Sequence, residues 1–213
     1  MVSVLTRGNP FDVFISSDGF ILDEQDDGAK IAVGNLTQKG QMLYYRPDFE
    51  VIIDRGNFSS LEEKLENGII DGFVYSGLRV EAIGKQDIVA EVFTSSICMP
   101  EAGQGVIALL CRKQDRKVHG LLKELNDPAC YTEFILERKF ASMFLSDIKI
   151  PSGVLSSVEG SECRIEAMVV APDGSERISA SVEGKVSNGD KLIASLEKEL
   201  MSSGAEELIQ AYK

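Results

Sequence analysis

Short runs rich in valine and isoleucine alternate with helix-like segments through the first two thirds of this 213-residue chain. Strands that are joined by helices form sheets whose faces those helices cover. The expected strands are residues 12–15, 30–33, 50–54, 72–75 and 106–111. The pattern therefore predicts an α/β fold for this part of the chain.

Two helices in this part can be recognised from their ends. The Ser-Ser-Leu-Glu-Glu run at Ser59 is typical of a capped helix start, and Gly68 ends the segment, which predicts a helix over residues 59–66. Residues 113–125 carry apolar side chains at helical spacing until Asn126-Asp127-Pro128 breaks the pattern. This break is the expected boundary between two domains.

The last third of the chain mixes helix and strand patterns. Residues 131–144 are predicted to form an amphipathic helix, with Phe134, Ile135, Phe140 and Phe144 facing inward. The segments expected after it are strands 154–157, 163–170 and 177–182, a hairpin turn at Pro172-Asp173-Gly174, and a helix over 190–212 that is capped by Asp190 and interrupted at Gly204. This part is therefore expected to be a small α+β module.

Charge and composition argue against several classes of protein. The chain has 22 Lys and Arg against 34 Asp and Glu, a net charge of −12, whereas proteins that bind nucleic acids cluster basic residues. Its longest apolar stretches fall far short of the roughly 20 residues of a membrane helix. The N-terminus lacks the pattern of a secretory signal, so we expect a cytoplasmic protein with no nucleic-acid or membrane partner.

The cysteines and the single histidine give no sign of a metal site. The four cysteines show no paired spacing, and each stands in or beside an apolar run. His119 is the only histidine and lies in a helix-like segment. We therefore expect buried free thiols and no bound metal.

Three short segments are candidates for ligand binding. Gly103 and Gly105 flank Gln104, so backbone N–H groups there could approach an anion, although the glycines alone favour a tight turn. Arg55 and Gly56 follow an apolar strand, which is where open α/β sheets bind ligands. Arg55 could hold a carboxylate in a forked pair, or it could bridge loop carbonyl groups.

The third candidate segment is residues 33–40. It is expected to be a polar loop that follows a strand, is bounded by Gly34 and Gly40, and carries one cation, Lys39.

A series of short motifs gives the chain a family resemblance. The motifs are Ile31-Ala32-Val33-Gly34, Arg46-Pro47-Asp48, Arg55-Gly56-Asn57, Pro100 through Gly105, Cys111-Arg112, Glu137-Arg138, Pro151 with Gly153, and Ala171-Pro172-Asp173-Gly174. In this order, and from about Asn9 to the end, the chain resembles the porphobilinogen deaminases, also called hydroxymethylbilane synthases. The resemblance implies two domains like type II periplasmic binding proteins, with a mixed sheet, followed by a small α+β domain.

The resemblance also divides the chain into domains. Residues 1–10 and 100–126 would be crossover pieces of domain one, residues 11–99 domain two, and residues 127–213 domain three. The family's catalytic aspartate belongs to a segment that precedes the matched region. We therefore expect a second chain to supply this part of domain one.

The activity implied by the resemblance is the condensation of four porphobilinogen molecules to hydroxymethylbilane in tetrapyrrole, and so haem, biosynthesis. The growing chain is carried on a dipyrromethane cofactor that is bound to a cysteine by a thioether. Cations pair with the carboxylates of the pyrroles. The resemblance assigns carboxylate binding to the cations Lys39 and Arg55 and to the amide of Gln104, with loop backbone at Gly34, Gly56, Gly103 and Gly105.

Several positions depart from the family pattern. Ile148 stands where the cysteine that carries the cofactor is expected, and an isoleucine forms no thioether. Gly40, Leu61 and Ala82 stand where the family has arginines, and Arg79 could compensate for Ala82. These changes put covalent attachment of the cofactor, and catalysis itself, in question.

Three hypotheses follow from the sequence. The first is a deaminase of tetrapyrrole biosynthesis that binds pyrrole carboxylates and works with a second chain, which would also cover the edge of strand 106–111. The second is a catalytically inactive binding or interaction module that retains the deaminase core and forms a homo-oligomer through that strand. The third is a different transferase or anion-binding protein that uses Lys39, Arg55 and Gln104.

Overall fold

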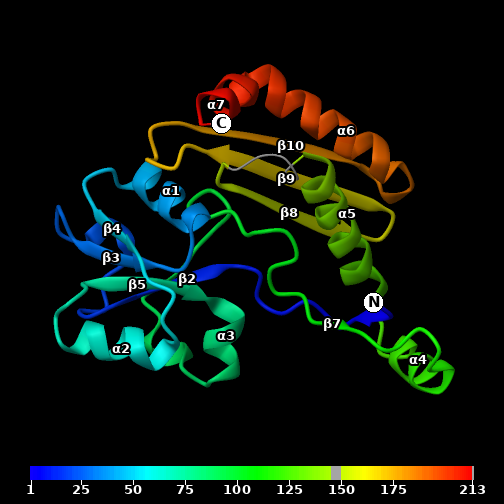
Figure 1. Ribbon diagram of the computed structural model, residues 1–213, viewed down its shortest axis with the longest axis horizontal. Coiled ribbons are helices and arrows are strands. Elements are labelled where there is room, and N and C mark those ends of the chain that lie inside the picture. The colour runs from blue at the N-terminus through cyan, green and yellow to red at the C-terminus, as the bar shows by residue number, and fades with distance from the viewer. Residues whose placement is uncertain (145–149, 213) are drawn as a thin grey trace.

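A computed structural model describes residues 1–144 and 150–212 of the chain, and within them the strands form three separate sheets (Figure 1). The largest is a five-stranded sheet of order β4-β3-β5-β2-β6. Its strands are β2 (Asp12–Ser16), β3 (Lys30–Val33), β4 (Glu50–Ile53), β5 (Gly72–Ser76) and β6 (Glu91–Val92). Strand β3 is parallel to β4 and β5, whereas β2 is antiparallel to β5 and β6, so the sheet is mixed.

Helices cover both faces of this sheet (Figure 1). Helix α1 (Leu36–Tyr45) packs on one face, while α2 (Phe58–Glu66) and α3 (Gly77–Ala82) pack on the other. Successive residues of a strand point to opposite faces, so Phe14 enters the core beside α1 while its neighbours Val13 and Ile15 enter the other. This two-sided burial explains why the strands read as continuous apolar runs.

The N-termini of α1 and α2 correct two expectations. Residues 36–40 are not a loop, because the Asn35 side chain accepts a hydrogen bond from the backbone N–H of Gln38 at 2.7 Å and caps a helix there. Helix α2 is capped by Asn57, which accepts from the backbone N–H of Ser60 at 3.0 Å. It begins at Phe58, so the Ser59 cap was wrong.

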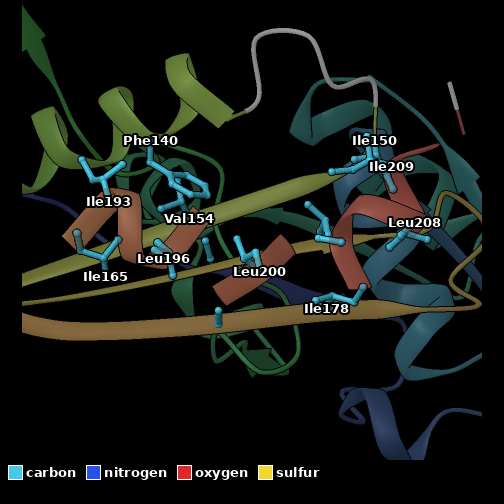
Figure 2. Close-up of a cluster of buried hydrophobic side chains, with 14 of the residues drawn as sticks. Phe140, Ile150, Val154, Ile165, Ile178, Ile193, Leu196, Leu200, Leu208 and Ile209 are labelled. Atoms are coloured by element: carbon cyan, nitrogen blue, oxygen red, sulfur yellow. The ribbon is translucent and has the colours of Figure 1, made fainter. Parts of the chain in front are cut away.

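The C-terminal part is an antiparallel sheet covered by helices on one face. Strands β8 (Ser152–Glu159), β9 (Glu162–Val170) and β10 (Arg177–Lys185) lie in the order β10-β9-β8. Helices α5 (Pro128–Phe144) and α6 (Gly189–Leu200) pack on them, and Figure 2 shows Phe140, Val154, Ile165 and Leu196 meeting in the core between. Gly174, at φ 74°, closes the predicted turn between β9 and β10.

The helices of this module differ from expectation in detail. Ile135 is 39% exposed, while Leu136 and Glu137 are buried, so the inward face of α5 is rotated from the predicted one. The Phe144 side chain lies outside the described residues. Helix α6 begins before Asp190 and has no side-chain cap at Asn188, whereas the predicted break at Gly204 is confirmed by its φ of 107°.

The third sheet has only two short strands. Strand β1 (Ser3–Val4) pairs antiparallel with β7 (Ala108–Leu109), so the expected strand 106–111 is shorter than predicted and lies outside the main sheet. Helix α4 (Arg116–Lys123) follows β7 and projects from the rest of the molecule (Figure 1). The remaining elements are η1 (Leu22–Glu24), η2 (Gln86–Ile88), η3 (Val186–Asn188), the π-helical turn η4 (Met201–Ala205) and α7 (Glu206–Ala211).

The architecture confirms the predicted class, an α/β unit with a mixed sheet followed by a small α+β module. The expected domain limits stay a prediction. None of the helices in the described part of the chain is long and apolar enough to span a bilayer. Residues 1–144 and 150–212 also contain no cluster of three His, Cys, Asp or Glu side chains suited to a metal ion.

Candidate functional site

A cavity of about 470 Å³ lies at the carboxyl ends of the parallel strands of the five-stranded sheet, and we call it the carboxyl-edge cavity. The parallel strands β3, β4 and β5 all end there, and the antiparallel strand β2 begins there with Asp12. The segment 104–106 lines the cavity as well. Loops at the carboxyl ends of parallel strands are where open α/β sheets bind ligands.

The cavity brings together most of the residues singled out from the sequence. Gly34, Arg55, Gly56, Gln104 and Gly105 line it. Arg79, considered as compensation for Ala82, lines it too, because α3 begins directly after β5.

Lys39 and Gly103 do not line the cavity. Lys39 belongs to α1, so the expectation that it stands in a loop was wrong. The N–H of Gly103 is already used, because it donates to Glu137 Oε2 at 2.7 Å. A ligand-binding role for either residue stays a prediction.

Arg55 and Arg79 are exposed cations at the cavity. Neither forms an ion pair with any residue of the described chain. The neighbouring carboxylate, Asp54, is instead held by Lys64 and by the backbone N–H of Gly56 at 2.9 Å. The hydrogen bond from Lys64 holds the pKa of Asp54 below its usual value, so both guanidinium groups remain available to a carboxylate ligand.

Gly105 fixes how the segment 104–106 enters the site. Its φ of 79° favours glycine, and a Cβ there would lie 2.8 Å from the carbonyl oxygen of Gly8. The glycine thus allows the two crossover segments of the chain to pass in contact, with Gln104 pointing into the cavity. The segment is a tight turn that also lines the cavity, so the two interpretations of the sequence are compatible.

Asp12 was missed by the sequence reasoning. It is only 4% exposed, and it accepts hydrogen bonds from Gln104 Nε2 at 2.9 Å and from Gln38 Nε2 at 2.8 Å. Burial raises its pKa to about 6. The signal in the sequence was an acidic residue opening an otherwise apolar strand; Gln38 was overlooked because its segment was expected to be a loop.

The cysteines are poor attachment points for a covalent group. Cys98, Cys130 and Cys163 are buried, and burial raises the pKa of each thiol, which lowers the fraction of reactive thiolate. Cys111 is half-buried and does not line the cavity. Ile148, the expected attachment position, lies outside the described residues.

Comparison with known proteins decides the family. The model of a family described as "Porphobilinogen deaminase, dipyromethane cofactor binding domain" matches residues 1–120. A protein named porphobilinogen deaminase from Desulforamulus reducens is 31% identical over 98% of this chain and 67% of its own length. One of the same name from Pelotomaculum thermopropionicum gives the same values.

The chain belongs to the porphobilinogen deaminase family. It spans about two thirds of the length of these deaminases. Among solved structures, the substrate-binding protein of an amino acid ABC transporter is 17% identical, with a TM-score of 0.32 over 58% of this chain and 56% of that one, a likeness too small to support any argument. The deaminase resemblance inferred from the motifs is thereby confirmed.

Proposed function

We propose that this protein acts in tetrapyrrole biosynthesis, where it binds pyrrole carboxylates in the carboxyl-edge cavity and condenses porphobilinogen to hydroxymethylbilane together with a second chain. One observation carries the proposal. Arg55, Arg79 and Gln104 line a single cavity, and the described residues supply no acidic partner for either arginine. Membership of the deaminase family supports the choice of ligand.

The chemistry of the ligand matches these groups. Porphobilinogen carries an acetate and a propionate side chain, so each molecule brings two carboxylates to the site. Guanidinium groups pair with carboxylates through two parallel hydrogen bonds, and each such charge-assisted pair contributes about 1.5–3 kcal/mol. Arg55 and Arg79 would each take one carboxylate, and the Gln104 amide would add a neutral donor.

A dipyrromethane cofactor fits the cavity in part. Its carboxylates suit the guanidinium and amide groups that line the cavity. The thioether anchor does not fit, because three thiols are buried and the fourth, Cys111, lies outside the cavity. We therefore propose that this chain holds pyrroles without a covalent bond, and that its residues bind and orient them.

The proposed second chain would cover the surface formed by Ile107, Leu110, Leu121 and Leu125, which we call the β7–α4 surface. Leu110 is 72% exposed and Leu121 is 60% exposed. Exposed apolar side chains that gather in a patch are typical of protein interfaces. The two strands β1 and β7 also leave pairing edges. The proposed occupant is a chain that carries the third of the relatives' length that is unmatched here, including the catalytic aspartate.

Production of hydroxymethylbilane tests this proposal. The chain is incubated with porphobilinogen, alone and with a polypeptide equivalent to the unmatched third of a relative. We expect product only in the mixture, and we expect Leu110→Asp to abolish it while Ile69→Asp, at an exposed apolar residue that precedes β5, leaves it unchanged. If neither sample forms product although porphobilinogen binds, the protein is a binding protein and not an enzyme.

That alternative, a catalytically inactive module, is supported by the position of Gly40. A Cβ on this residue would lie 2.8 Å from the carbonyl oxygen of Ala171, so α1 packs on the C-terminal module with no room for an arginine. One carboxylate contact of the family is therefore unavailable at this position. Cytoplasmic localisation and the oligomeric state stay predictions under both functions.

A further inference from the structure

Asp12 joins three segments of the chain beneath the carboxyl-edge cavity. Its carboxylate opens β2, accepts from Gln38 of α1 at 2.8 Å, and accepts from Gln104 of the crossover segment at 2.9 Å. All three side chains line the cavity. Within residues 1–144 and 150–212 no cation forms an ion pair with Asp12.

The side-chain oxygen of each glutamine also accepts a hydrogen bond. The Oε1 atom of Gln38 accepts from the backbone N–H of Gly34 at 2.7 Å, and that of Gln104 accepts from the backbone N–H of Glu101 at 3.3 Å. A carboxamide has one acceptor end and one donor end. Each Asp12 oxygen accepts one amide N–H, and protonation would place a donor O–H on one of them, so the network favours the ionised carboxylate.

The orientation of the amides decides what they offer a ligand. Each Nε2 nitrogen carries two N–H groups, and one of them is used by Asp12. The described residues supply no acceptor for the second N–H of either glutamine. These two donors belong to side chains that line the cavity, as do Arg55 and Arg79.

The other groups around Asp12 do not neutralise the negative charge of its carboxylate. The Cys98 thiol donates to Oδ2 at 3.8 Å, and Glu101 adds a repelling charge. Asp54, at the same cavity, is held by Lys64. A buried carboxylate without a cation destabilises the fold, and such groups are concentrated at functional sites.

We infer that Asp12 is a positioning residue, whose ionised carboxylate turns the amides of Gln38 and Gln104 so that both present an N–H to a carboxylate ligand. The inference rests on the proposed function for its ligand class. The two roles that Asp12 could have predict opposite effects of its removal on ligand binding. As a bare negative charge Asp12 would repel the ligand, so its removal would tighten binding, whereas as a positioning residue its removal weakens binding.

Calorimetric titration with porphobilinogen separates these consequences. We expect Asp12→Asn to raise the Kd by about tenfold or more, because the new carboxamide offers a donor to one of the two glutamine amides and turns it away from the ligand. Asp26→Asn, an exposed carboxylate remote from the cavity, is the control and should leave the Kd unchanged. An unchanged or lower Kd for Asp12→Asn would overturn the inference.

A second readout needs no ligand and so distinguishes failure of this inference from failure of the proposed function. In the NMR spectrum of the ¹⁵N-labelled chain, the side-chain amide signals of Gln38 and Gln104 should shift together with a midpoint near pH 6, where Asp12 titrates. In Gln104→Glu, which keeps the shape but removes the donor, the Gln38 midpoint should move upward. Gln38 and Gln104 amide signals that stay unchanged while the Asp12 carboxyl signal titrates would overturn the inference even if porphobilinogen binds.

Discussion

Arg7 and Glu137 form a buried ion pair across 130 positions of the chain, with Arg7 Nη1 lying 2.7 Å from Glu137 Oε1. The Glu137 carboxylate, fully buried, also accepts from the backbone N–H groups of Gly103 and Ser156. A single side chain of α5 therefore ties the C-terminal module to both crossover segments. The position of Gln104 at the cavity depends on this contact, because Gly103 directly precedes it.

Glu137→Gln should destabilise the protein strongly. The change removes the nearer charged partner of the buried Arg7 guanidinium, at 2.7 Å, and leaves only the longer contact to Glu133 at 3.4 Å, which lowers the free energy of unfolding by roughly 3 kcal/mol. Urea denaturation measures the change. Glu133→Gln, which removes a longer contact to Arg7 at 3.4 Å, is the control and should lower it by about 1 kcal/mol.

The double variant Arg7→Met with Glu137→Met should recover only the part of that loss that comes from the unpaired charge, because the backbone N–H groups of Gly103 and Ser156 lose their acceptor in both variants. A Glu137→Gln variant as stable as the unmodified chain would show that the pair does not hold the two parts together.

Gly105→Ala should also lower stability, for a steric reason. The residue has a φ of 79°, and a Cβ would meet the carbonyl oxygen of Gly8 at 2.8 Å. Strain of this kind costs of order 1–3 kcal/mol, and thermal unfolding should show a lower Tm. Gly120→Ala on α4 is the matched control, because no atom lies within 4 Å of its Cβ and alanine stabilises a helix by about 1 kcal/mol. Equal Tm changes of the same sign would contradict the close passage of the crossover segments.

Asp12 should give the stability of the protein an unusual dependence on pH. Its pKa is about 6 in the folded state against 3.8 ordinarily, so its contribution is largest below pH 4 and is lost as the pH rises through 6. Two pKa units correspond to about 3 kcal/mol. The difference in unfolding free energy between the unmodified chain and Asp12→Asn should therefore fall by up to about 3 kcal/mol from pH 4 to pH 7.

The comparison of the two chains removes the other carboxylates from this measurement. Asp54 and Asp127 have lowered pKa values, so their contribution to stability rises with pH. This contribution is the same in both chains and cancels in the difference. A difference that does not vary with pH would mean that Asp12 titrates normally in the folded protein.

Thiol chemistry checks the absence of a covalent anchor. Iodoacetamide should modify Cys111 first, because the other three cysteines are buried and burial raises the pKa of their thiols. Intact mass spectrometry after incubation with porphobilinogen should give the unmodified mass. An adduct of dipyrromethane size, retained in Cys111→Ala, would mean that a buried cysteine carries the cofactor.

The strands could be predicted where local pattern and environment agree. Strand β3 was predicted with its observed bounds, because burial on both faces leaves an uninterrupted apolar run between polar ends. Strand β7 was predicted too long, since its apolar residues are paired only where Ser3 and Val4 lie opposite. The length of that strand depends on a partner more than a hundred positions away and not on its own sequence.

The site was predictable in part for the same reason. Arg55 and Gln104 could be found because ligand sites follow strand ends and glycine-flanked turns. Asp12 could not, since its role depends on Gln104, 92 positions away. Lys39 was misplaced because the cap by Asn35 turned an apparent loop into a helix.

The measurement that tests the central claim most directly is calorimetric titration of porphobilinogen into the unmodified chain and into the double variant Arg55→Ala with Arg79→Ala. The account predicts saturable binding to the unmodified chain and a loss of about a hundredfold in the double variant, about tenfold for each carboxylate contact. Lys198→Ala, an exposed cation on α6, should bind like the unmodified chain. Equal affinity of the double variant would contradict the carboxyl-edge cavity as the binding site, and absence of binding to the unmodified chain would contradict the proposed ligand.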